Sequence, residues 1–134
     1  MILSQTTTGS MGEYITAAAI ISLGWKVAIA QQDHLDLVAF NDNHFLRIQV
    51  KTATLKYRKH YTPGYQFNNG SGSKKKILTP EKYDILAHCA ADHRRCVFYA
   101  SHTVNQVTKR YAGTYFENPF IEQESWTKAI ELAS

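Results

Sequence analysis

The spacing of apolar residues changes along the chain, and these changes predict its secondary structure. Residues 11–24, MGEYITAAAIISLG, are rich in alanine and predict a helix of about 13 residues that stops at Gly24. Along this helix Glu13, Ala17 and Ile20 share one face, so an acid heads an otherwise apolar stripe. Residues 25–31, 35–40 and 45–53 predict three strands, and the turn NDNH joins the second and third as a hairpin.

The second half of the chain predicts two more strands and two more helices. A polar segment, residues 56–76, precedes the sequence TPEKYD, where Thr79 caps a short helix and Pro80 occupies its first turn. Residues 84–90 and 96–101 predict strands, and residues 124–133 predict an amphipathic last helix. The order helix, three strands, loop, short helix, two strands, helix indicates a mixed α/β fold around one sheet, in a single domain over residues 1–134.

Polar side chains interrupt these apolar elements at four positions. In the third strand, FLRIQVKTA, the aliphatic residues point one way, so Gln49 and Lys51 point the other. Asp36 lies in the neighbouring strand of the hairpin, and the preceding helix brings Glu13 over the same spot. Burying such groups without partners is costly, so we expect the four to act together.

The chemistry of these four residues fits hydrolysis of a phosphodiester. Carboxylate and amide oxygens from Glu13, Asp36 and Gln49 are ligands that suit Mg²⁺, which keeps several waters. One of those waters would serve as the nucleophile, and Lys51 would orient it or stabilise charge on the phosphate. Simpler interpretations remain: Glu13 favours a helix N-terminus, Asp36 and Lys51 form a structural ion pair, and Gln49 is an exposed strand residue.

Composition places the chain among ordinary soluble proteins. The 134 residues are 44% hydrophobic and 19% charged, and no apolar run approaches the roughly 18 residues of a membrane span. The start, MILSQTTTGS, lacks the pattern of a secretory signal, and two cysteines form no disulfide framework. We therefore expect no membrane association and a cytoplasmic location.

Positive charge gathers in one stretch of the sequence. The net charge is +4, but residues 55–79 carry six cations and no acid. Such a patch points to a polyanion, and these side chains are predicted to contact DNA phosphates. The six are Lys56, Arg58, Lys59, Lys74, Lys75 and Lys76.

Aromatic and histidine residues near these segments have two interpretations each. Tyr57, Tyr61, Tyr65 and Phe67 pack either on sugars and bases or on each other, and the segment NNGSGSKKK is alternatively a solvated excursion. His34 and His44 flank the site and either touch phosphate or are surface residues. The group His88, Cys89, His93 and Cys96 matches no standard zinc spacing, so no zinc site is expected.

The ordered motifs resemble a known family. GE at residues 12–13, LDLVAF around Asp36, QVKTA at residues 49–53 and the following YDILAH resemble the PD-(D/E)XK nuclease superfamily. The resemblance spans residues 9–101 and is greatest to a Gln-x-Lys branch that includes intron-encoded homing endonucleases and resembles archaeal Holliday-junction resolvases. It implies a restriction-endonuclease-like fold, with a mixed central sheet flanked by helices and an αβββαβ core. The sequence departs from the family pattern at Gln49, where most members have an acid, and at Leu35, where the name-giving proline is absent.

The resemblance also implies roles for individual residues. Asp36 and Glu13 correspond to metal-binding acids, the carbonyl of Val50 is a further ligand, and Gln49 with Lys51 corresponds to the acid-x-Lys motif. The implied function is a Mg²⁺-dependent DNA endonuclease, with Mn²⁺ able to substitute, that cuts both strands as a homing endonuclease does. A homodimer or homotetramer acting on double-stranded or branched DNA is expected, because one site cuts one strand. Residues 83–101 and the last helix are candidate interface surface. The alternatives are a Holliday-junction or other structure-specific resolvase, and a non-catalytic DNA-binding protein on the same fold.

Overall fold

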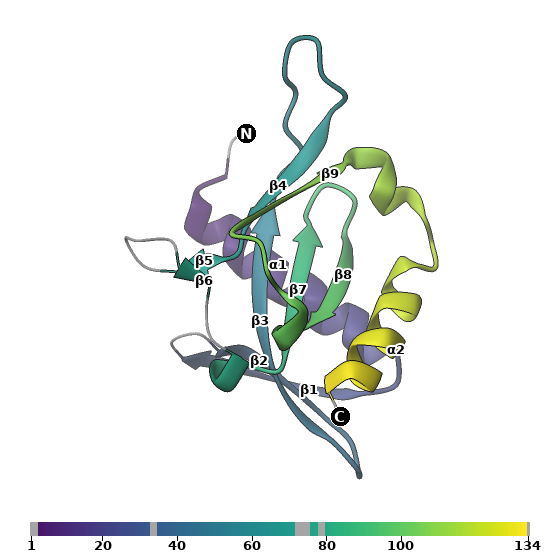
Figure 1. Cartoon of the computed structure of the whole chain (residues 1–134). Helices are drawn as coiled ribbons and strands as arrows, with labels where there is room; N and C mark the ends of the chain where they lie inside the picture. The colour runs from purple at the N-terminus through teal and green to yellow at the C-terminus, as the bar shows by residue number, and fades with distance from the viewer. Residues whose placement is uncertain (1–2, 33–34, 72–75, 78–79, 134) are drawn as a thin grey trace.

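The computed structural model describes residues 3–32, 35–71, 76–77 and 80–133, and within them five strands form one mixed sheet (Figure 1). The strand order is β1-β2-β3-β7-β8, antiparallel except where β3 pairs in parallel with β7. Two short pairs, β4 with β9 and β5 with β6, lie outside this sheet. No helix in the described ranges is long and apolar enough to span a membrane. The helices and strands are α1 Gln5–Ser22, β1 Lys26–Gln32, β2 Leu35–Phe40, β3 Phe45–Ala53, β4 Gly64–Asn68, β5 Gly70–Ser71, β6 Lys76–Ile77, β7 Ile85–Ala90, β8 Arg95–Ala100, β9 Thr108–Ala112 and α2 Ile121–Ala133.

The hairpin of β2 and β3 has the predicted bounds. Its turn is held by Asn41, whose Oδ1 accepts hydrogen bonds from the backbone N–H groups of Asn43 and His44, each at 2.8 Å. Asparagine favours this local turn, which explains why the sequence locates it so well. β1, β7 and β8 each lie within one residue of their predicted ranges.

The first helix begins earlier than predicted. α1 starts at Gln5, because the Ser4 side chain caps it by accepting a hydrogen bond from the N–H of Thr7 at 3.1 Å. A capped helix extends at little cost from a packed segment, even through threonines of modest helix propensity. The predicted end is confirmed: Leu23 is the C-cap, and Gly24 follows with a φ of +95°.

Two apolar clusters cover the two faces of the sheet. In Figure 1, α1 runs behind the sheet and β9 crosses in front of it. The α1 side holds the larger cluster, in which α2 also packs through Trp126. The other side holds a cluster of aromatic residues from β4 and β9, a pair of strands called here the β4–β9 ribbon. The sequence did not predict β9, and it assigned β4 to the basic loop.

The connection from β3 to β7 contains less helix than expected. The predicted short helix is a single 3₁₀ turn, Pro80–Lys82, and its predicted cap Thr79 lies outside the described residues. The predicted fold class, a mixed sheet flanked by helices, is confirmed.

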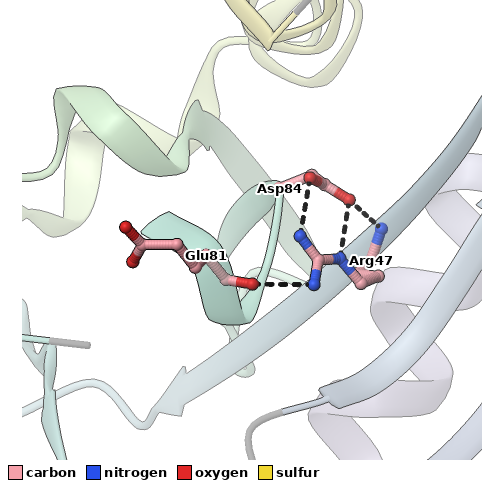
Figure 2. Close-up of polar contacts among 3 residues, drawn as sticks. All are labelled: Arg47, Glu81 and Asp84. Atoms are coloured by element: carbon pink, nitrogen blue, oxygen red, sulfur yellow. Dashed lines mark hydrogen bonds and ion pairs between the residues drawn. The ribbon is translucent and has the colours of Figure 1, made fainter. Parts of the chain in front are cut away.

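An arginine–aspartate pair joins the starts of β3 and β7 (Figure 2). Asp84 Oδ2 accepts hydrogen bonds from the backbone N–H of Arg47 at 2.8 Å and from its Nε at 3.1 Å, and Oδ1 accepts from Nη2 at 3.2 Å. Arg47 Nη1 also donates to the carbonyl of Glu81 at 2.8 Å. The pair therefore ties the 3₁₀ turn to β3 and fixes where the parallel strand begins.

We expect Asp84→Ala to lower the free energy of unfolding by about 2 kcal/mol, because Arg47 loses three charge-assisted hydrogen bonds. Urea denaturation measures the change. Asp42→Ala is the control, because Asp42 is an exposed carboxylate in the β2–β3 turn, where substitutions cost less than about 0.5 kcal/mol. Equal effects of the two substitutions would contradict an anchoring role for Asp84.

The predicted interface over residues 83–101 is wrong for most of this segment. All residues of β7 are buried, because the strand lies between β3 and β8. The outer edge of β8 is occupied by α2: the N–H of Cys96 donates to Glu122 Oε2 at 3.0 Å, and the N–H of Phe98 donates to Ser125 Oγ at 3.1 Å. A covered edge strand is not available for pairing with another chain.

Candidate active site

The pairing between β2 and β3 ends at Asp36. Their paired register runs from Phe40 opposite Phe45 to Leu37 opposite Ile48. Beyond it the Asp36 carboxylate continues the ladder, and its Oδ2 accepts the backbone N–H of Val50 at 2.8 Å. Because the N–H and C=O of one strand residue point to the same side, the Val50 carbonyl also faces this gap. Asp36 and the Val50 carbonyl therefore lie at one opening in the sheet.

Glu13 enters the same opening from α1. The helix approaches β3 closely at Gly12, where a Cβ would overlap the side chain of Thr52. Glu13 follows directly and faces Asp36. Burial raises the pKa of Glu13, and Asp36 raises it further through its charge and through a hydrogen bond between the two side chains. The structure thus brings together the two acids that the sequence pairs across 23 positions, with nearby negative charge that a cation would neutralise.

Lys51 is held next to these acids, and its environment acts on it in opposite directions. Burial lowers the pKa of its ammonium, whereas the charge of Asp36 raises it. Lys51 points to the face of the sheet opposite the α1 cluster, as the alternation in β3 predicts. Its amine is therefore a partly desolvated group facing a carboxylate.

Gln49 supplies an acceptor whose hydrogen bond is missing. Its Oε1 is buried, and no hydrogen-bond partner for it exists among the described residues. A buried amide oxygen without a partner is costly, and it suits a site completed by a bound ion. The interpretation of Gln49 as an exposed strand residue is wrong, because its side chain is partly covered and its oxygen is buried.

The donor set fits a hard divalent cation. Two carboxylates, one amide oxygen and one backbone carbonyl are the oxygen ligands that Mg²⁺ or Mn²⁺ takes, and water fills the remaining positions. Within the described ranges, no group of three or more His, Cys, Asp or Glu side chains could hold a metal. The site has only two acids because Gln49 occupies the position of a third.

A buried histidine stands beside Lys51 on the neighbouring strand. β3 and β7 pair Lys51 with His88, whose Nε2 lies 2.6 Å from Asn69 Oδ1 and whose Nδ1 lies 2.8 Å from Tyr111 Oη. The Asn69 amide is oriented by Nδ2, which donates to the carbonyl of Gln106 at 2.9 Å. His88 Nε2–H therefore donates to Asn69, and Nδ1 accepts from Tyr111.

We expect His88 to stay neutral far into acid. Burial, together with the positive charges of Lys109 and Lys51, lowers the pKa of His88 to about 3. In the unfolded chain this imidazole is protonated below about pH 6.5. The contribution of neutral His88 to the free energy of unfolding is therefore complete above that pH. It is lost as the pH falls toward 3, by at most about 1.4 kcal/mol per pH unit.

Nitrogen-detected NMR of the imidazoles checks this expectation. The His88 resonances should keep the pattern of a neutral ring protonated at Nε2 down to pH 4.5. His102, which is exposed on the 3₁₀ turn Ser101–Thr103, is the reference in the same spectra. Protonation of His88 above pH 5 would contradict the assigned network.

The predicted basic loop is two different structures. Lys56 and Gly64 exchange backbone hydrogen bonds of 2.8 and 3.1 Å and close a protruding segment, residues 56–64, called here the finger (Figure 1). The finger exposes Lys56, Arg58 and Lys59 together with Tyr57 and Tyr61. Lys74 and Lys75 lie outside the described residues, and Lys76 begins β6.

The aromatic residues of this region divide into two groups. Tyr57 and Tyr61 are 77% and 74% exposed, so they are available to a partner. Tyr65 and Phe67 are buried and stack with ring centroids 6.3 Å apart, so packing on each other is the correct interpretation for this pair. The difference follows from β4, whose alternate residues face the sheet.

The structure does not bring the cysteines and histidines of residues 88–96 together. Cys89 and Cys96 are buried and unbridged, directly opposite each other on the α1 side. His88 points to the other face, and His93 Nδ1 lies 2.6 Å from Tyr65 Oη. His44 packs against the ring of Trp25, and His34 lies outside the described residues. Lys109, whose charge lowers the pKa of His88, was not predicted as a functional residue. The alternation of polar and aromatic residues in TKRYA could have indicated a strand there.

The α/β fold brings the acids, the amide and the lysine together where two strands separate, as expected for a nuclease. The family model for PD-(D/E)XK endonucleases matches residues 3–111, and the chain belongs to this family. A solved structure of a bacterial homing endonuclease, I-Ssp6803I, shares the fold, with a TM-score of 0.72 and 15% identity over 96% of this chain and 95% of that chain. A search of curated protein sequences finds no match. The predicted membership in the PD-(D/E)XK superfamily is confirmed.

Proposed function

We propose that this protein is a DNA endonuclease that requires a divalent cation, Mg²⁺ with Mn²⁺ as substitute, and cleaves both strands of a duplex. The observation that carries the proposal is the convergence of Glu13 and Asp36 beside the partnerless Oε1 of Gln49. Buried acceptors in proteins usually have a partner, and an ion bound here would supply one for the Gln49 oxygen. The homing type of cleavage is favoured over junction resolution by the likeness to a homing endonuclease.

Each residue of the site has a role in this proposal. Glu13, Asp36, Gln49 and the Val50 carbonyl would hold the cation, which when bound supplies positive charge and an activated water. Val50 N–H keeps Asp36 aimed into the gap by donating to Oδ2. Burial lowers the pKa of Lys51 and the charge of Asp36 partly offsets this; the Lys51 ammonium would stabilise negative charge on the phosphate.

The finger is the proposed contact with the DNA backbone. Lys56, Arg58 and Lys59 are exposed and carry no competing acid between them, so they are suited to phosphates. Lys74, Lys75 and Lys76 remain predicted contacts. One site cuts one strand, so we propose that a homodimer or homotetramer makes the double-strand break.

A cleavage assay with several DNA substrates tests the proposal. A random-sequence plasmid pool, a four-way junction and single-stranded DNA are each incubated with Mg²⁺, with Mn²⁺ or with EDTA. Linear products from the pool that depend on the metal support a homing-type enzyme. Cutting of the junction alone indicates a resolvase. Binding without cutting on any substrate overturns the proposal in favour of a DNA-binding protein that kept the nuclease fold.

A further inference from the structure

The β4–β9 ribbon has one buried face and one polar face. Alternate residues Tyr65, Phe67 and Tyr111 are buried against the sheet. Of the exposed residues that alternate with them, all but Ala112 are types that hydrogen-bond to base edges or carry positive charge. These outward-facing residues are Gln66, Asn68, Thr108 and Arg110.

The buried face fixes the ribbon on the side of the sheet that carries the candidate active site. Phe67 stacks on His88 with ring centroids 4.3 Å apart and planes 10° apart, and Tyr111 Oη bonds to His88 Nδ1. His88 is the partner of Lys51 in the β3–β7 register. The ribbon is therefore a rigid element beside the site and not a mobile loop.

On the polar face, the Gln66 amide lies within hydrogen-bond distance of two guanidinium groups, those of Arg110 and Arg58. Gln66 Oε1 accepts a hydrogen bond from Arg110 Nε at 3.0 Å and lies 3.4 Å from Arg58 Nη2. The two terminal nitrogens of Arg110 have no partner in the described part of the chain. The hydrogen bond from Nε fixes the plane of the Arg110 guanidinium. It leaves Nη1 and Nη2 to donate to a ligand that offers two acceptors.

An open groove of about 920 Å³ lies over this cluster. The finger contributes Lys56, Tyr57 and Arg58 to its walls, and the ribbon contributes Gln66 and Arg110. No acid lines it. Such a lining suits an anionic ligand with planar acceptor groups, as the major groove of DNA presents.

We propose that the outer face of the β4–β9 ribbon enters the major groove and that Arg110, positioned by Gln66, recognises a guanine. The inference rests on the proposed DNA substrate and adds the element that reads its sequence. A two-stranded ribbon fits the width of the major groove, and an arginine with two outward nitrogens matches the O6 and N7 acceptors of guanine. Contact with a phosphate does not require a guanidinium held in one plane, because any positive charge can make it.

Site selection from a random duplex library in EDTA tests this role without cleavage. Wild type should prefer guanine at one or more positions, and Arg110→Lys should lose about 10- to 100-fold of that preference while keeping its charge. The salt dependence of binding should stay unchanged, since the number of cations is the same. Lys128→Arg, on the exposed side of α2, is the control that keeps charge and should leave the selected sequence unchanged.

Variants of Gln66 separate positioning from contact. Gln66→Leu should weaken the guanine preference, and Gln66→Glu should retain it, because a carboxylate also accepts the Arg110 Nε–H. Selection of the same sequences by wild type and Arg110→Lys would overturn the inference, as would a wild type without any base preference. A wild type that shows no metal-dependent cleavage but has a sequence preference that depends on Arg110 would refute the nuclease function. The same result would support base recognition by the ribbon.

Discussion

Replacing Asp36 by asparagine is expected to lower the rate of DNA cleavage by at least about 10²- to 10³-fold. The substitution replaces one of the two carboxyl groups that face each other at the opening between β2 and β3. Asparagine keeps an oxygen acceptor for the N–H of Val50, so the ladder at this position survives. Single-turnover cleavage of a plasmid in Mg²⁺ measures the loss.

Binding measurements distinguish lost chemistry from lost structure. Asp36→Asn should bind DNA in EDTA with the affinity and salt dependence of wild type, because the proposed phosphate contacts lie on the finger. Lys51→Met should show the same combination, since methionine keeps the buried stem of the side chain and removes only the ammonium. Cleavage by Asp36→Asn at the rate of wild type would exclude this carboxylate from the active site.

The second large effect is expected from Gly12→Ala in α1. A Cβ at residue 12 overlaps the Thr52 side chain, which is short and branched and has little room to move. The helix must shift away from β3, at a cost of about 1–3 kcal/mol in the free energy of unfolding. Because Glu13 moves with the helix, cleavage should also fall, by about 10²-fold for a displacement near 1 Å.

A second glycine of the same helix provides the control. At Gly9 an added Cβ meets no atom within 4 Å, so Gly9→Ala should stabilise the protein by about 0.5–1 kcal/mol through helix propensity. Chemical denaturation of both variants and their cleavage rates complete the comparison. Changes of the same sign in stability would show that helix propensity, and not the contact with β3, dominates at Gly12.

Local sequence patterns were sufficient for the hairpin and for most of the site. Strand alternation is a property of the backbone, so FLRIQVKTA by itself places Gln49 and Lys51 on the face opposite the apolar residues. The Asn41 turn sets the partner strand, and the partner strand carries Asp36. Glu13 was predicted from helix periodicity together with the family resemblance.

Other features depend on contacts between distant parts of the chain. β4 and β9 pair Tyr65 with Tyr111 across 46 positions, and neither strand shows a pattern that names its partner. The 3₁₀ turn before β7 has the composition of a helix start, but the Arg47–Asp84 pair fixes the chain there before a longer helix can form.

The sequence by itself therefore determined the strands of the hairpin and the polar residues they carry, because these follow from periodicity and side-chain type. The resemblance of its motifs added the nuclease family, which the family model confirms. Only the tertiary structure decided how closely α1 brings Glu13 to Asp36, since that depends on the absence of a Cβ opposite Thr52. It also decided that Gln66 and Arg110 meet on one polar face, because strand pairing over long separations is set by packing of the buried aromatic residues beneath them.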